Sequence, residues 1–272
     1  MCTATWLSEA EGYQLFFSRD EARDRAPARP PERHVWDGVH VLAPIDGAAG
    51  GTWLAANEFG LAVCLLNAST AYGPLDPAEG VDEPRSRGLL VRDMASSASE
   101  AELEDRLSRE PLERYRGFRL GSFAPSRDAA AGTKRLAVRV WAWDGSTLRE
   151  EVVRQPLASS SLGSERAHAE RGRTLGTFGL PEATEPAEDA RPEDLRNGFD
   201  RGGALEAFHR SHAPERGPWS VCVHRAEVTT LSLCHVRVDA GRVGLRYAAG
   251  SPCESAFGPE TSLARRVARP AS

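Results

Sequence analysis

Hydrophobic and polar residues alternate along the start of the chain, with the two-residue period of a β-strand. Residues 2–7 and 13–17 predict two strands separated by a turn at Gly12. Two strands this close in sequence form a hairpin. The hairpin would return residues 18–21 to the side of Cys2.

Further along, apolar runs and turn residues predict more strands and helices. Additional strands are predicted to open at 50–54 and to lie at 61–66, 136–143, 147–153, 219–238 and 242–247. Helices are predicted at 87–95, after the capping box at 99–102, and at 163–175 and 199–210. Residues 23–33 are rich in Arg and Pro and predict a loop, because Pro cannot continue a central strand. The acidic, Pro-containing residues 182–194 predict a surface connection.

This order of elements runs strands, helices, strands, helices, strands, without strict alternation of one strand with one helix. Such an order disfavours a parallel doubly wound sheet and favours two mainly antiparallel sheets with helices outside, an α+β fold. The chain has 272 residues, 40% of them hydrophobic, so residues 1–272 can form one domain with a sizeable core. It contains neither a Gly-x-Gly-x-x-Gly motif nor a P-loop, so a nucleotide-binding fold has no support.

The charge, the apolar runs and the cysteines argue against several classes of protein. The net charge of −5 argues against a nucleic-acid partner. No apolar run is long enough to span a bilayer, and the N-terminus does not resemble a signal peptide, so we expect a cytoplasmic protein. Disulfides are not expected, because there are five cysteines and no Cys-x-x-Cys pair. The spacing of Cys222, Cys234 and Cys253 is irregular for zinc, and we expect no metal.

Cys2 is the most informative single residue. Removal of Met1 would leave a chain that begins with a thiol beside a free α-amine, whose ordinary pKa values of about 8.5 and 7.7–8.0 suit proton exchange between them. In the predicted hairpin, Arg19 would favour the thiolate, and Asp20 would hold the α-ammonium. The alternative is an inert buried cysteine with Arg19 and Asp20 as a surface ion pair.

Several motifs then resemble one family. They are Met1–Thr3, Ser18–Glu21, Gly50–Leu54, Asn57–Leu61, Leu66–Asn67, Ser86–Val91 and Ser220–His224. Together they resemble the Asn-Arg-Asp-Glu family, also called the transport and Golgi organisation protein 2 family. The resemblance covers nearly the whole chain and is strongest over residues 1–95.

The N-terminal half is also similar, more distantly, to the penicillin V acylase and bile-salt hydrolase group. These resemblances imply the four-layer αββα fold of N-terminal-nucleophile hydrolases. They imply a cysteine amidohydrolase or acyltransferase that acts on a linear amide or acyl ligand through a thioester. Cys2 would be the nucleophile, Arg19 and Asp20 would set charge and orientation, and Asn67 would stabilise the oxyanion.

The chain departs from its relatives at three places. Ser18 replaces the Asn of the name-giving tetrad, Ser160 stands where relatives carry a second oxyanion Asn, and Arg225 would compensate for Val228 at a position where relatives carry Arg. These departures keep open a non-catalytic carrier of haem, lipid or acyl-CoA on the same fold. If the protein is an enzyme, we expect no cofactor. His209 and His212 lie three apart, a spacing compatible with a metal or haem pair. The oligomeric state is left open.

Overall fold

The computed structural model describes residues 2–68, 84–127, 134–180 and 200–266. Its strands form two sheets, and every strand pair within them is antiparallel. The six-stranded sheet has the order β10 (Leu157–Ser159), β1 (Cys2–Glu9), β2 (Gly12–Ala22), β11 (Val228–Val238), β12 (Arg242–Ala249) and β13 (Thr261–Ala264). The seven-stranded sheet has the order β3 (Arg29–Trp36), β4 (Val39–Ile45), β5 (Leu54–Asn57), β6 (Ala62–Asn67), β7 (Phe118–Arg127), β8 (Lys134–Trp143) and β9 (Leu148–Glu151).

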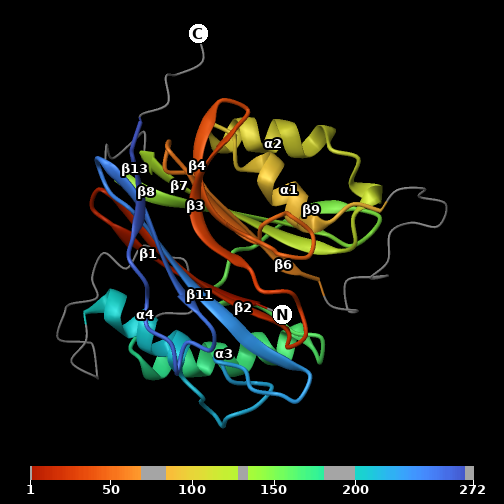
Figure 1. Ribbon diagram of the computed structural model, residues 1–272, viewed down its shortest axis with the longest axis vertical. Coiled ribbons are helices and arrows are strands. Elements are labelled where there is room, and N and C mark those ends of the chain that lie inside the picture. The colour runs from red at the N-terminus through yellow and green to blue at the C-terminus, as the bar shows by residue number, and fades with distance from the viewer. Residues whose placement is uncertain (1, 69–83, 128–133, 181–199, 267–272) are drawn as a thin grey trace.

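Helices cover the outer face of each sheet, as Figure 1 shows. The helices α1 (Arg87–Met94) and α2 (Glu100–Arg109), followed by the 3₁₀ turn η2 (Leu112–Arg114), lie on the seven-stranded sheet, and α3 (Ser164–Thr177) and α4 (Arg201–Arg210) lie on the six-stranded one. The result is the αββα sandwich that the sequence and its resemblance predicted. No helix in the described part of the chain is long and apolar enough to cross a membrane.

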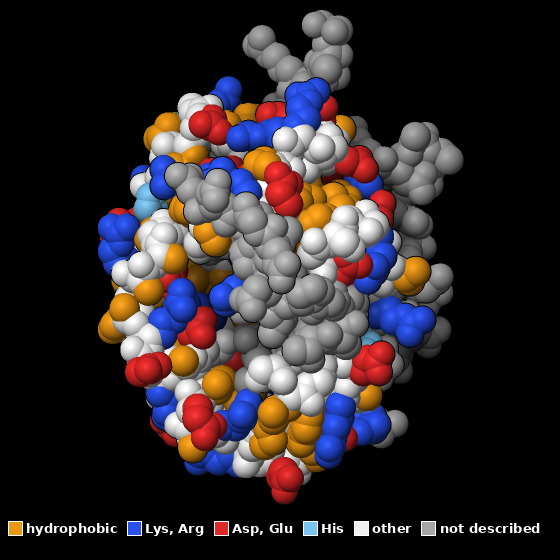
Figure 2. Space-filling view, turned by 90° about the vertical axis from the view of Figure 1, so that its right-hand side faces the viewer, with side chains coloured by type: hydrophobic (Ala, Val, Ile, Leu, Met, Phe, Trp, Pro, Cys, Tyr) orange, Lys and Arg blue, Asp and Glu red, His pale blue; other side chains and the backbone are white. Residues whose placement is uncertain are grey.

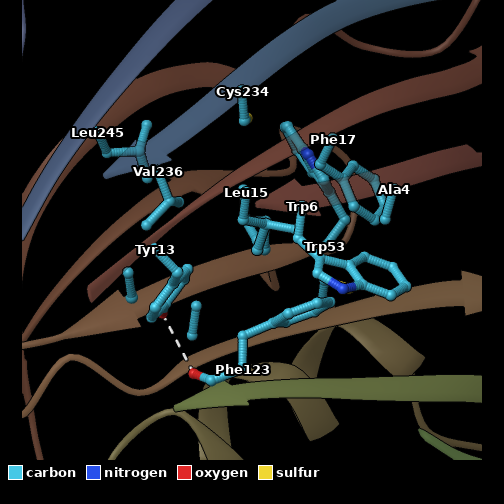
Figure 3. Close-up of a cluster of buried hydrophobic side chains, with 14 of the residues drawn as sticks. Ala4, Trp6, Tyr13, Leu15, Phe17, Trp53, Phe123, Cys234, Val236 and Leu245 are labelled. Atoms are coloured by element: carbon cyan, nitrogen blue, oxygen red, sulfur yellow. Dashed lines mark hydrogen bonds between the residues drawn. The ribbon is translucent and has the colours of Figure 1, made fainter. Parts of the chain in front are cut away.

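The core between the two sheets is built by the inward faces of their strands. Alternation along β1 and β2 sends Trp6 and Tyr13 into this core, where both rings lie near Phe123 of the facing sheet (Figure 3). The Tyr13 hydroxyl donates to the Phe123 carbonyl oxygen at 3.1 Å, which satisfies a buried polar group. Residues of the opposite parity point towards the helices, as Phe16 does. Cys2 lies on the face between the sheets.

Most of the predicted elements are confirmed. The first hairpin, the buried strand at 61–66 and the hairpin around Asp144–Gly145 are present as β1–β2, β6 and β8–β9. The helices at 87–95, 163–175 and 199–210 and the strand at 242–247 match within a few residues. The Ser99 hydroxyl caps α2 by accepting from the Glu102 amide, as the capping motif predicted.

Two predictions are wrong. Residues 23–33 are not all loop, because β3 begins at Arg29 and runs through both prolines. It is the edge strand of its sheet, with a register shift between Arg29 and Glu32, and an edge is where a sheet tolerates Pro. The strand at 219–238 begins only at Val228, because the apolar residues 221–223 lie in bends and are buried there without sheet pairing. The predicted connection at 182–194 lies outside the described residues.

Two glycines of the family motifs, Gly51 and Gly88, allow two backbone segments to lie in direct contact. A Cβ added to Gly51 would lie 2.3 Å from the Gly88 carbonyl carbon, so the turn before β5 can touch the start of α1 only without a side chain there. The Thr52 amide donates to the Gly88 carbonyl oxygen at 2.9 Å across this contact. The contact therefore locks α1 onto the sheet.

The surface carries both signs of charge. On the described part of the face in Figure 2, Lys and Arg side chains are interspersed with Asp and Glu, without an extended patch of one sign.

Candidate active site

Cys2 is the first residue of β1 and sits between two neighbouring strands. Its partner in β2 is Arg19, and its partner in β10 is Ser159. Residues directly opposite in adjacent strands project to the same side of a sheet. Arg19 and Ser159 are therefore fixed beside Cys2 by strand register, and Cys2 is only 6% exposed.

The nitrogen and the sulfur of Cys2 both have a polar partner. Its nitrogen donates to the Ser159 hydroxyl oxygen at 3.0 Å. Its sulfur accepts a hydrogen bond from the backbone N–H of Asp20. The nitrogen and the sulfur are thus each oriented by one protein group.

Arg19 is held in place by acidic and aromatic neighbours. Its Nη2 lies 2.5 Å from Asp46 Oδ2 and 3.6 Å from Glu21 Oε2, and its guanidinium carbon lies 4.3 Å from the centre of the Trp53 ring. Asp46 also pairs with Arg25 and accepts from two backbone amides. Arg19 is therefore buried, but its charge is balanced within the cluster.

The Asp20 carboxylate points to the helix side of the six-stranded sheet. Its Oδ1 accepts from the Thr230 hydroxyl at 2.6 Å, and its Oδ2 lies 3.4 Å from Arg171 Nη2 of α3. The Asp20 and Arg171 side chains are both fully buried. Arg171 also donates to the Cys2 carbonyl oxygen and to the Thr3 hydroxyl. These bonds fix the backbone on both sides of the Cys2 side chain.

The thiol of Cys2 is protonated at neutral pH in this setting. Burial raises its pKa, and this outweighs the influence of Arg19 and of the Asp20 amide, which both favour the thiolate. Burial likewise raises the pKa of Cys64, and that of Cys234 to about 12. Cys2 differs from these two buried thiols in having Arg19 and the Asp20 amide beside it.

Asn67 closes β6 in the facing sheet. It is half-buried, and its side chain makes no hydrogen bond within the described part of the chain. Its strand partner is Phe118, and the next residue, Arg119, reaches the Ala158 carbonyl oxygen of β10 at 3.5 Å. The end of β6 therefore lies at the same end of the sandwich as Cys2. The Asn67 side chain does not share the face of Cys2, because its partner Phe118 packs on the helix side of the seven-stranded sheet, and residues directly opposite project to the same side.

The two weaker candidates lie elsewhere. The Ser160 amide donates to Ser164 Oγ at the start of α3, so Ser160 belongs to the turn after β10, while Ser159 faces Cys2. Arg225 lies before β11, with its Nη2 3.8 Å from Glu227. Among the described residues it makes no hydrogen bond or ion pair with Cys2.

The hydroxyl of Ser18, which replaces the family's Asn, points away from the Cys2 sulfur. Its hydroxyl lies 2.7 Å from His209 Nδ1, and the Thr5 hydroxyl lies 2.9 Å from His209 Nε2. His209 is fully buried between these hydroxyls.

Sequence reasoning missed three residues of this site, Ser159, Thr230 and Arg171. Ser159 is the neighbour of Ser160, which the sequence singled out, and the strand period would have selected Ser159 once β10 was known. Thr230 lies opposite Asp20 in β11. Arg171 carries no local signal, because its role depends on where α3 docks.

Two solved structures have folds similar to that of this chain. The fold is similar to that of a Caenorhabditis elegans N-acylethanolamine-hydrolyzing acid amidase ortholog, with 13% identity and a TM-score of 0.44, covering 86% of this chain and 92% of that one. It is also similar to a mutant of conjugated bile acid hydrolase from Clostridium perfringens, with 11% identity and a TM-score of 0.44, covering 92% of this chain and 89% of that one. No curated protein matches the sequence.

A family match covers the N-terminal half, which contains the hairpin of Cys2 and Arg19, Asn67 and the Gly51–Gly88 contact. The family model described as Transport and Golgi organisation 2 matches residues 1–139, just over half of the chain. The chain therefore belongs to the Transport and Golgi organisation 2 family.

Proposed function

We propose that this protein is an N-terminal-cysteine amidohydrolase or acyltransferase that acts on small linear amides once Met1 is removed. The observation that supports this best is the arrangement around Cys2. Its nitrogen is bonded to Ser159, its sulfur accepts from the Asp20 amide, and Arg19 lies directly opposite.

The raised pKa of the Cys2 thiol favours a mechanism in which the thiol loses its proton only as it attacks. A free α-amine has an ordinary pKa of about 7.7–8.0 and can accept that proton near neutral pH. The Ser159 hydroxyl, which contacts this nitrogen, is placed to orient the amine lone pair or to relay the proton.

The reaction then balances in two steps. The Cys2 sulfur bonds to the amide carbonyl carbon, its proton passes to the α-amine, and a tetrahedral oxyanion forms. The ammonium gives the proton to the leaving nitrogen, the C–N bond breaks, and a thioester remains. Water or an acceptor amine then attacks the thioester with the α-amine as base, which releases the acyl group and restores the thiol.

The oxyanion needs a hydrogen-bond donor that is not already engaged. The family resemblance gives this role to Asn67, whose amide makes no hydrogen bond within the described residues and whose strand ends at the same end of the sandwich as Cys2. Its side chain has to turn from the helix side of β6 to reach the oxyanion. A donor of this kind contributes on the order of 3 kcal/mol to transition-state stabilisation. Asn67→Ala should therefore lower kcat by roughly a hundredfold.

The first experiment combines intact mass with turnover of a panel of fluorogenic N-acyl amides of increasing chain length. We expect the purified protein to lack Met1, and we expect Cys2→Ala to abolish turnover. The matched control is Cys234→Ala, which removes another buried thiol of the same core and should leave turnover in place.

A second arm tests the amine separately from the thiol. A variant with an uncleavable N-terminal extension keeps the Cys2 sulfur but blocks its amine, and should be inactive, whereas a C-terminal extension should be tolerated. Full activity of the N-terminally extended protein, or retention of Met1 in the folded protein, would contradict the mechanism. Saturable haemin binding that Cys2→Ala does not change, without amide turnover, would support the carrier instead.

A further inference from the structure

Four metal-ligating side chains meet outside the candidate active site. His212, Cys222, His224 and Cys253 each offer one ligand atom, and these atoms all lie within 4.8 Å of one another. His224 Nε2 is 3.5 Å from Cys222 Sγ and 3.3 Å from Cys253 Sγ. The His212 and His224 ring centres lie 5.1 Å apart.

The four residues come from three segments that the fold holds together. His212 follows α4, Cys222 and His224 precede β11, and Cys253 lies in the turn after β12. The Cys222 amide donates to the Ser211 carbonyl oxygen at 3.0 Å, and His224 forms an isolated β-bridge with Thr229. The backbone around the cluster is therefore fixed by bonds that do not involve the four side chains.

A second observation points to a missing ligand. His212 Nε2 is buried and has no hydrogen-bond partner in the described part of the chain. A buried polar atom without a partner costs on the order of 1–3 kcal/mol, so native structures rarely keep one without a purpose. A metal ion at the centre of the cluster would satisfy it.

The set of donors selects the metal. Two thiolates and two imidazoles in a tetrahedral arrangement are typical of structural Zn²⁺ sites. With Zn–S of about 2.3 Å and Zn–N of about 2.0 Å, tetrahedral geometry places N and S ligands about 3.5 Å apart. The two N–S distances at His224 already have this value within about 0.2 Å, so small side-chain movements complete the site.

We propose that His212, Cys222, His224 and Cys253 bind one Zn²⁺ ion that joins the segment before β11 to the turn after β12. Four protein ligands leave no open position, so the site is structural rather than catalytic. Binding converts two thiols to thiolates and releases two protons to solvent. A ligand set with these spacings is not apparent in the sequence, which pointed to Cys234 and His209. The structure places Cys234 in the sheet core and His209 against Ser18.

The outer contacts of the cluster can adjust to the metal. Binding through His224 Nε2 leaves a proton on Nδ1, which now faces Arg216 Nη2 at 3.3 Å. Arg216 also pairs with Glu254 at 3.1 Å, and both side chains are more than half exposed. Glu254 can therefore replace Arg216 as the partner of Nδ1, since a carboxylate accepts that proton.

The proposed site is linked to the Cys2 sulfur by a chain of three hydrogen bonds through Thr230 and Asp20. The Val223 amide, between two of the ligands, donates to the Thr230 hydroxyl oxygen at 2.8 Å. That hydroxyl donates to Asp20 Oδ1 at 2.6 Å, and the Asp20 amide donates to the Cys2 sulfur. The metal would thus help to hold the backbone that supports Asp20.

The test uses the reduced full-length protein without a histidine tag. After removal of metal with a chelator, Zn²⁺ is added in competition with a chromophoric chelator, and Co²⁺ is added in a separate titration. We expect one Zn²⁺ per chain and a Co²⁺ spectrum with strong visible bands of tetrahedral geometry and thiolate charge transfer. Bound Zn²⁺ should also protect Cys222 and Cys253, and no other cysteine, from alkylation.

Variants locate the site. Cys222→Ser and Cys253→Ser should weaken Zn²⁺ binding by at least a hundredfold and remove the charge-transfer band of the missing thiolate. Cys253→Ser is the safer variant for folding, because Cys253 lies in a partly exposed turn. The controls Cys234→Ser and His40→Ala should bind as the parent does. No stoichiometric Zn²⁺ binding by the reduced parent, or equal affinity in folded Cys253→Ser, would overturn the proposal.

Discussion

The buried imidazole of His209 should make the fold less stable as the pH falls below about 6. Burial, and after it the charge of Arg171, lower the pKa of His209 to about 3. Its ring stays neutral between Thr5 and Ser18, one nitrogen donating and the other accepting. In the unfolded chain the same imidazole has a pKa of about 6.5 and takes up a proton.

The direction and the size of this change in the free energy of unfolding follow from proton linkage. The unfolded state binds more protons than the folded state between the two pKa values, so stability falls as the pH is lowered through that range. Each unit of pH below about 6.5 costs about 1.4 kcal/mol per histidine. At pH 5 the loss from His209 is therefore about 2 kcal/mol. Burial lowers the pKa of His235 to about 3 as well, and it adds a loss of similar size.

The assay is urea unfolding at several values between pH 7.5 and pH 4.5, with the free energy of unfolding plotted against pH. His209→Gln lowers stability at pH 7.5, because Gln cannot reach both hydroxyls, but it should remove about 2 kcal/mol of the loss between pH 7.5 and pH 5. The matched control is His40→Gln, since the His40 side chain is exposed and should leave the slope unchanged.

The comparison between variants separates this histidine from the carboxylates that also titrate in acid. If the loss of stability between pH 7.5 and pH 5 is the same in His209→Gln as in the parent, the imidazole is already charged in the folded state, and the reasoning fails. If His40→Gln changes the slope of the free energy of unfolding against pH as much as His209→Gln does, the effect does not depend on burial of the imidazole.

Two further predictions concern buried polar groups. Arg171→Met leaves the Asp20 carboxylate buried without its cation, and should lower the free energy of unfolding by about 3–5 kcal/mol in urea unfolding. The control is Arg173→Met on the same helix, which breaks an ion pair whose Arg side chain is exposed and should cost less than about 1 kcal/mol. Asn57→Ala should cost roughly 3 kcal/mol in the same assay, because the Asn57 amide bonds four backbone groups that would be left buried and unpaired; a change below about 1 kcal/mol would show that water replaces it.

The part of the site that could be predicted from sequence is the part built by a local hairpin. Alternation over residues 2–17 with a turn at Gly12 determines the register, and the register places Arg19 opposite Cys2. The layers were predicted from the order of the elements along the chain and from the resemblance to the family. The hairpin and the order of the elements are properties that a single sequence contains.

The remaining part of the site depends on contacts between residues far apart in the chain. Ser159 reaches Cys2 only because β10 joins the edge of the six-stranded sheet, and Arg171 reaches Asp20 only because α3 docks with that face inward. Neither the pairing of β10 nor the docking of α3 can be predicted from the hydrophobic pattern around Ser159 or Arg171. The cluster around His224 is hidden in the same way, because its ligands come from bends and turns whose positions are set by the packed fold.

The two-residue period of β2 also explains why a departure at Ser18 is tolerated. Arg19 lies on the face between the sheets, together with Cys2, whereas Ser18 and Asp20 point to the helix layer, where they meet His209 and Arg171. Replacing Asn by Ser at position 18 therefore alters packing behind the strand and leaves the face that carries the sulfur unchanged. Side chains on the helix layer act on Cys2 only through the backbone that they hold in place.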